Sequence, residues 1–137
     1  MNKEMTSSKP YIIRALYEWI CDNGCTPYVT VRATLKNVKV PEAYVRDGWI
    51  TLDLSPTAVN NLLIDNRAIS ARARFGGVIH ELYLPIGSIA MIFASETKAG
   101  MEFVPEETSF DDADRDIPES TARVKKPRFK VIRNDDA

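Results

Sequence analysis

A β-hairpin within residues 67–94 constrains the fold of this chain more than any other feature of the sequence. Residues 67–75 read RAISARARF, where apolar and polar side chains alternate as they do along a half-buried strand. Gly76 and Gly77 follow, and glycines here supply the positive φ angles that a tight hairpin turn requires. Residues 78–84 then return as the partner strand. The chain is therefore predicted to build a β-sheet around this hairpin.

Small side chains on the first of these strands leave its surface low beside the glycine turn. Ala71 and Ala73 share one side of the strand with Phe75, while Arg72 and Arg74 lie on the other side. A low apolar strip next to a basic rim suits an extended peptide. Its apolar residues would rest on the strip, and an arginine would pair with its acidic groups. We therefore expect a peptide groove at this place.

Residues 8–23 form the one convincing helix of the sequence. Ser8 is a suitable N-terminal cap and Pro10 fits the first turn. Asn23 and Gly24 together make a stop signal at the C-terminal end. We therefore predict a single amphipathic helix ahead of the strands.

Two apolar stripes run along this helix, whereas a surface helix normally buries a single apolar arc. The first stripe contains Ile12, Leu16 and Trp19, and the second contains Ile13, Tyr17 and Ile20. One body is too small to cover both, so we predict that the second stripe packs against another copy in a homodimer. The predicted dimer interface comprises Ile12, Ile13, Leu16, Tyr17 and Ile20. The alternative is that one subunit covers both stripes with its own sheet and loops.

The rest of the body reads as short strands separated by turns. Alternating segments occur at residues 28–34, 49–54 and 62–65, and the short apolar run 90–94 favours a further buried strand. The loop at 35–47 contains PEAYVR, which fits one helical turn. One N-terminal helix followed by five or six short strands predicts a mainly β fold, either a small, strongly bent β-barrel or a sandwich.

Charge is distributed unevenly along the chain, although the formal net charge is only −1. Residues 1–104 are nearly neutral and are predicted to form the folded domain. Residues 105–122 are acidic and poor in apolar side chains, which predicts a disordered, flexible linker. Residues 123–137 combine basic and apolar side chains, as short docking peptides do. A frayed basic end without function is the alternative for this last segment.

The sequence carries no recognisable catalytic or metal-binding motif. Cys21, Cys25 and His80 are too few for a metal site, and no serine lies in a nucleophile motif. We therefore expect neither an enzyme nor a cofactor. The chain has no apolar leader and no apolar run near the roughly 18 residues that a membrane span needs, so we expect a cytoplasmic protein.

Binding of single-stranded RNA is the alternative function from another class. Small barrels bind single strands by combining basic rims with aromatic platforms, and Arg72, Arg74, Phe75 and Lys98 would supply both. The nearly neutral body argues against nucleic acid as a partner. Salt separates the two hypotheses, because RNA binding weakens steeply with salt and binding to a partly apolar peptide groove weakens less.

Several segments together resemble the stringent starvation protein B family, the adaptors of the ClpXP protease. They are the helix KPYIIRALYEWICDN and the later segments TPYVTV, VPEAYVRDGWI, SPTAVNNL and ARFGGV. The resemblance runs from about Pro10 to Ala94 and resumes at KKPRFKVIR near the end. The helix and ARFGG in combination make the resemblance specific.

The resemblance implies a homodimeric adaptor with an Sm-like or SH3-like β-barrel, in which the N-terminal helices form the dimer contact. Such adaptors capture proteins that carry the ssrA tag, which is added to stalled nascent chains during ribosome rescue. Their flexible C-terminal peptide docks on the N-terminal zinc-binding domain of the ClpX unfoldase. The adaptor thereby delivers the substrate and does not cut it.

The resemblance also implies which residues bind each partner. The tag-binding groove is predicted to contain Tyr44, Val45, Ala71, Ala73, Arg74, Phe75 and Gly76, with Phe93 as a wall. In the tail, Phe129, Val131 and Ile132 are predicted to make the apolar docking contacts, flanked by Lys130 and Arg133. Phe129 stands where the family usually has an aliphatic residue.

Overall fold

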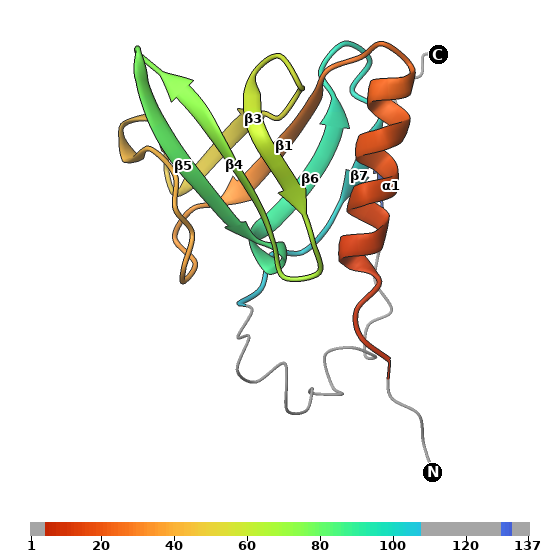
Figure 1. Cartoon of the computed structure of the whole chain (residues 1–137). Helices are drawn as coiled ribbons and strands as arrows, with labels where there is room; N and C mark the ends of the chain where they lie inside the picture. The colour runs from red at the N-terminus through yellow and green to blue at the C-terminus, as the bar shows by residue number, and fades with distance from the viewer. Residues whose placement is uncertain (1–4, 108–129, 133–137) are drawn as a thin grey trace.

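The computed structural model describes residues 5–107 and 130–132 (Figure 1). One α-helix precedes the strands, as predicted. In chain order the elements are α1 (Lys9–Asp22), β1 (Pro27–Arg32), the 3-10 helix η1 (Glu42–Tyr44), β2 (Trp49–Asp53), β3 (Val59–Ile64), β4 (Ala68–Phe75), β5 (Val78–Pro85), the 3-10 helix η2 (Ile86–Ser88), β6 (Ile89–Ala94), β7 (Gly100–Glu102) and β8 (Lys130–Ile132). The prediction of a mainly β fold with one N-terminal helix is confirmed.

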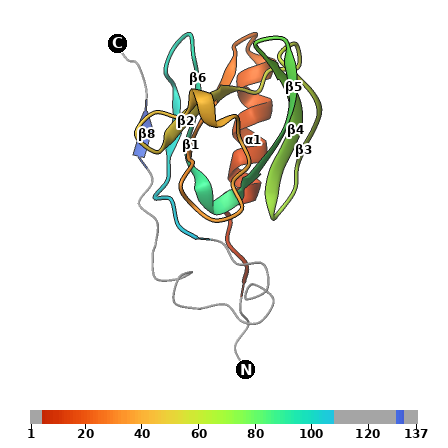
Figure 2. The same ribbon diagram turned by 90° about the vertical axis from the view of Figure 1, so that its left-hand side faces the viewer.

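The strands form two open sheets that lie face to face (Figure 2). One sheet has the order β2-β1-β6-β7-β8 and the other has the order β3-β4-β5. Their inner faces carry the buried side chains of the core, since every second residue of a strand points the same way. These include Val29, Val31, Ile50, Leu52, Ile69, Leu82, Leu84 and Ile92. The small bent β-structure is thus built as a pair of packed sheets.

The central hairpin has the predicted form. Gly76 and Gly77 have φ angles of 59° and 84°, the left-handed values that glycine adopts without a steric penalty. This two-residue turn pairs Phe75 with Val78 and carries the register along both strands to Ala68 and Pro85. The side chains of β4 alternate between a buried and a more exposed side, as its sequence predicts.

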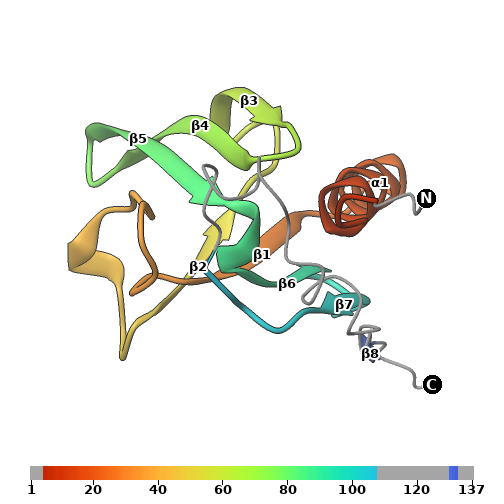
Figure 3. The same cartoon turned by 90° about the horizontal axis from the view of Figure 1, so that it is seen from below.

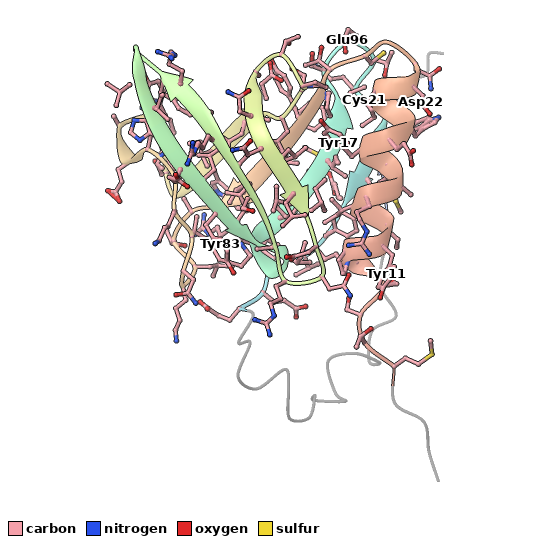
Figure 4. All side chains as sticks on the ribbon, viewed as in Figure 1. Tyr11, Tyr17, Cys21, Asp22, Tyr83 and Glu96 are labelled. Atoms are coloured by element: carbon pink, nitrogen blue, oxygen red, sulfur yellow. The ribbon has the colours of Figure 1, made fainter. Side chains whose placement is uncertain are left out.

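Helix α1 covers one of the two open sides between the sheets (Figure 3). Ile13 and Ile20 are buried in the core, with 0% and 1% of their surface exposed. Arg14 donates a hydrogen bond to the carbonyl oxygen of Ile64, 3.2 Å away. Tyr17 points from α1 toward the sheets (Figure 4), and its hydroxyl donates to the carbonyl oxygen of Leu54 at 2.8 Å. Burial raises the pKa of Tyr17 to about 12, so the phenol stays protonated and keeps donating.

This packing corrects the prediction of which apolar stripe of α1 faces a second subunit. Ile13 and Ile20, which the sequence suggested for the dimer interface, have no surface left for a partner because the same subunit buries them. The outward side of α1 instead carries Tyr11 and Trp19, which are 50% and 48% exposed. Ile12 and Leu16 are half-buried beside them. Any contact between subunits through α1 therefore uses the stripe of Trp19, and the core uses the stripe of Ile13.

One charged group, Lys9, is buried on the side of the fold that α1 covers, which we call the sealed side. Lys9, at the start of α1, has its Nζ buried without a hydrogen-bond partner among the described residues, and Nζ lies 4.9 Å from the centre of the Phe103 ring. Desolvation lowers the pKa of Lys9 to about 8, and the nearby charge of Glu106 acts in the opposite direction. The buried ammonium is a local cost to stability.

The segment between β1 and β2, residues 33–48, covers the side opposite α1 (Figure 3). It is attached to the edge of β5 through Lys39 and Tyr83, whose backbone N–H groups donate to each other's carbonyl oxygens at 2.8 and 3.1 Å. From there the chain continues through η1 toward the turn of the hairpin. The PEAYVR motif, predicted to form one helical turn, lies in this segment as η1.

The described body extends slightly past the predicted boundary at residue 104. The backbone N–H of Glu106 donates to Gly87 at 2.8 Å, and the carboxylate of Glu107 accepts from the backbone N–H of Lys36 at 3.3 Å. Residues 105–107, assigned to the linker by composition, therefore contact the folded body. The rest of the predicted linker and most of the predicted docking peptide lie outside the described residues.

Candidate functional site

An aromatic cluster lies where η1 meets the turn of the β4–β5 hairpin. The rings of Tyr44 and Phe75 lie 5.1 Å apart between centroids with a tilt of 54°. Phe75 also meets His80 edge-on, at 5.6 Å and 82°. Pairs of this geometry add stabilisation beyond the area they bury. We call the group Tyr44, Val45, Phe75, Gly76 and His80 the hairpin-end site.

Local structure explains why Tyr44 is presented to solvent. Pro41 precedes η1 in an extended conformation, and the N–H groups of Tyr44 and Val45 donate to Pro41 and Glu42, at 3.0 and 3.1 Å. This single tight turn directs the two neighbours differently. Tyr44 is 46% exposed, while Val45 is half-buried against the core. Val45 therefore anchors this segment in the core, while the ring of Tyr44 stays accessible to a ligand.

Gly76 brings the turn close to Tyr44. A Cβ placed on Gly76 would lie 3.4 Å from the tyrosine hydroxyl oxygen, in van der Waals contact. Any side chain at this position would therefore project toward the accessible part of the cluster, besides meeting the strain of a φ angle of 59°. Glycine keeps both the turn and the space beside Tyr44.

Ala71 and Ala73 lie on the same side of β4 as Phe75, as predicted, and this side faces the core. They are only 5% and 9% exposed. Their small side chains make room within the sheet packing and present little surface of their own. The accessible surface near them comes mainly from the aromatic cluster.

Arg74 alternates to the outer side of β4, away from Phe75 and Ala73. It is exposed, whereas Arg72 on the same outer side pairs with Glu81 across the strands at 3.0 Å between Nε and Oε2. Exposed pairs of this kind contribute little to stability. Arg74 therefore lies at the rim of the hairpin and not within the aromatic cluster.

Phe93 does not join the hairpin-end site. It lies on β6 in the other sheet, directed outward, where its ring meets Tyr28 edge-on at 5.7 Å between centroids. The ammonium of Lys98 lies 5.8 Å from the centre of its ring. The core separates this outer surface from Tyr44 and Phe75, so the structure does not bring Phe93 together with the other predicted groove residues.

His80 and the start of β5 are parts of the site that the sequence reasoning missed. Val78, opposite Phe75 in the register, is 57% exposed on the side of the aromatic cluster, whereas Ile79, opposite Arg74, is 58% exposed on the outer side. The position of His80 could have been predicted from the register of the hairpin. A two-residue turn at Gly76 and Gly77 places His80 opposite Ala73, and therefore on the side of Phe75.

The predicted unfoldase-docking residues are only partly described. Lys130, Val131 and Ile132 form β8, which pairs with β7. Phe129 and Arg133 lie outside the described residues. Residues 5–107 and 130–132 contain no group of three or more metal-ligand side chains placed to hold an ion. Within the same ranges, no helix has the length and apolar character to cross a membrane.

The fold and the site together define a class of protein: a small β-domain that carries an accessible aromatic site on one side of its sheets. A family model for stringent starvation protein B matches residues 7–136, and the chain belongs to this family. A stringent starvation protein B homolog from Haemophilus influenzae is 46% identical over 107 residues, which cover 78% of this chain and 71% of the relative.

Proposed function

We propose that this protein is an adaptor that binds ssrA-tagged polypeptides at the hairpin-end site and delivers them to the ClpXP protease by docking its C-terminal peptide on ClpX. Membership in the stringent starvation protein B family supports an adaptor role. The choice of site rests on the cluster of Tyr44, Phe75 and His80 beside exposed Val78. Clustered aromatic and apolar side chains are typical anchors for a bound peptide.

The edge of β5 provides backbone groups for the same peptide. Tyr83 bonds to Lys39 on the edge away from β4, and ladder directions alternate along a strand. The backbone groups of Ile79 and Glu81 therefore face the same edge. A peptide lying along it would gain main-chain hydrogen bonds from β5 and side-chain contacts from Tyr44 and Phe75, which is the logic of strand addition.

The residues of the predicted groove take unequal roles in this proposal. Tyr44 and Phe75 contact the peptide, Val45 supports Tyr44, and Gly76 leaves space for the chain. Arg74 attracts acidic groups of the tag from the rim of the hairpin. Ala71 and Ala73 set the packing beneath the site. Phe93 has no part in it.

A homodimer formed through the outward stripe of α1 belongs to the same proposal. Trp19 exposes a large aromatic side chain on the stripe that it shares with half-buried Ile12 and Leu16, and exposed Tyr11 lies roughly 80° around the helix from it. Aromatic residues of this kind are enriched at interfaces. Two subunits would present two tails to one unfoldase, and the second docking event would then be intramolecular.

Fluorescence anisotropy of a labelled ssrA-tag peptide, titrated with the protein at low and high salt, tests the binding function. We expect saturation at one peptide per subunit with a modest loss of affinity at high salt. Absence of peptide binding, together with salt-sensitive binding of single-stranded RNA, would contradict the adaptor function and favour the nucleic-acid alternative.

Removal of residues 123–137 tests the delivery step separately. The truncated chain is expected to bind the tag peptide with unchanged affinity and to lose stimulation of ClpXP degradation of a tagged substrate. Degradation and anisotropy measured on the same preparations make the comparison. Equal loss of both activities would mean that the segment supports the fold and is not a docking peptide.

A further inference from the structure

The outer edge of β7 pairs with a strand that comes from the far end of the chain. β8 lies antiparallel to β7 (Figure 3), with Gly100 opposite Ile132 and Glu102 opposite Lys130. Met101 stands opposite Val131 between them. The five-stranded sheet thus ends in a strand from the segment that the proposed function assigns to the unfoldase.

Backbone geometry shows which groups of β7 face this strand. The N–H of Phe103 donates to Ala90 in β6 at 2.8 Å, and Ala99 accepts from Ala94 at 2.9 Å. Because bonding directions alternate along an antiparallel strand, Met101 also faces β6. Gly100 and Glu102 then face β8. A short ladder of backbone bonds is therefore the natural connection between the two strands.

The sequence at these positions favours the pairing. Val131 and Ile132 are β-branched residues, which fit strands well. Lys130 and Glu102 occupy facing register positions, where opposite charges stabilise a pair of strands. Gly100 is required for another reason: a Cβ there would collide with the backbone of Ile92 and Phe93, so β7 lies close against β6.

We propose that the edge of β7 is a docking site for the chain's own residues Lys130–Ile132, and that this contact competes with docking of the same residues on the unfoldase. The site takes an extended, basic and β-branched segment. The competition rests on the proposed function, because it requires the tail to bind the unfoldase. Docking of the tail on β7 of the same chain is independent of that function.

The connection is long enough for this contact and keeps the tail concentrated near the body. β8 is joined to the described body at Glu107 by residues 108–129, and a chain of about 20 residues spans up to ~70 Å when extended. Tethering through such a segment gives an effective concentration on the order of millimolar. A weak contact of three residues is therefore enough to occupy the edge for much of the time, and a partner can still displace it.

Amide hydrogen exchange of the full chain without any unfoldase tests the docking in cis. The N–H groups of Gly100 and Glu102 are expected to exchange several-fold more slowly in the full chain than in a chain lacking residues 123–137. Ile132→Pro removes an N–H that faces β7 and is expected to abolish the difference. Val131→Pro is the matched control, because its N–H faces away from β7 and an edge strand tolerates proline there.

Equal exchange at Gly100 and Glu102 with and without the tail would overturn the proposal. Equal effects of Ile132→Pro and Val131→Pro would also overturn it, since the register would then be irrelevant. Protection that grows with protein concentration would place the strand on a neighbouring copy and contradict docking in cis.

Binding to the isolated N-terminal domain of ClpX tests the competition. A peptide of residues 123–137 is expected to bind about two- to tenfold more tightly than the full chain, and Glu102→Lys is expected to recover part of the difference. Identical affinities for all three would overturn the competition. If the peptide does not bind the domain at all, the docking step of the proposed function fails, while the exchange experiment still decides the docking in cis.

Discussion

The two open sides of the sheet pair are covered in different ways, and the difference separates stability from binding. On the side of α1, Ile13 and Ile20 are almost fully buried and Tyr17 donates a hydrogen bond to Leu54, just after β2. On the opposite side, Tyr44 leaves almost half of its surface exposed and meets Phe75 through ring contacts alone. The first side closes the core, and the second keeps a surface on which a peptide can rest.

The same difference is the reason why we assign tag binding to the side of Tyr44 and not to the side that α1 covers. Displacing α1 would uncover the core and break the hydrogen bonds from Arg14 to Ile64 in β3 and from Tyr17 to Leu54 after β2. A ligand at the hairpin-end site needs only to cover surface that is already exposed, and apolar burial there adds about 25 cal/mol per Å². Mutations on the two sides should therefore act on different measurements.

The largest effect is expected from Ile13→Ala on the sealed side. Loss of a fully buried isoleucine side chain leaves a cavity, and the free energy of unfolding should fall by about 2–5 kcal/mol. Urea denaturation at neutral pH measures the change. Ala15→Ser, on the exposed line of α1, is the control and should change stability by less than about 0.5 kcal/mol. Similar stability of both variants would mean that α1 does not seal the core.

Tyr44→Ala should have the opposite pattern to Ile13→Ala: a small change in stability and a large loss of affinity for the tag peptide. The ring is half exposed, so the free energy of unfolding should change by at most about 1 kcal/mol. Affinity for the tag peptide should fall at least about tenfold, because a central aromatic anchor is lost. Anisotropy and urea denaturation on one preparation give both values. Unchanged affinity would exclude Tyr44 from the site, and Tyr28→Ala on the other sheet is the matched control.

Lys9→Met removes the buried charged group from the side that α1 covers. Burial lowers its pKa from 10.5 to about 8, so the unfolded chain binds more protons between these values. The variant should be more stable than the wild type by about 1–2 kcal/mol at pH 7. The advantage should shrink as the pH rises from about 8 to 10.5, because Lys9 of the folded wild type is then neutral and its burial no longer costs the desolvation of a charge. Thermal unfolding across this range checks the sign, and an advantage independent of pH would contradict a buried ammonium.

Arg74→Glu should have the smallest effect, because Arg74 lies on the rim. Charge reversal should weaken binding of a tag peptide that contains acidic groups by roughly fivefold, most clearly at low salt. The oligomeric state in sedimentation should not change. Arg74→Gln serves as the control that removes the charge without reversing it. An unchanged affinity at low salt would remove Arg74 from the binding surface.

The hairpin and the helix were predictable from sequence because each depends on local chemistry. The Gly76-Gly77 turn determines the φ angles and the register, and the alternation along β4 determines which side is buried. The helix was predicted at nearly its observed bounds for the same reason. Its two stripes were not assigned correctly, since only the packing of the sheets decides whether Ile13 or Trp19 faces the core.

The candidate site was predictable only in part, because it joins segments that are distant in the chain. Tyr44 and Phe75 were paired through a family resemblance, and the structure brings them into contact. Phe93 was placed in the same groove, yet it lies on the outer side of the other sheet. β7 was missed because three residues, Gly100–Glu102, are too short to show a period, and their strand pairing depends on β6.

A chemical-shift footprint of the tag peptide on the isotope-labelled protein tests whether the peptide binds on the side opposite α1. We expect the largest amide shifts at residues 44–45 and 75–81, with little change in the buried stripe of α1. Saturation of these shifts should follow one binding curve at one peptide per subunit. The largest shifts around Tyr28 and Phe93, or along α1, would contradict the assignment of binding to the side opposite the helix.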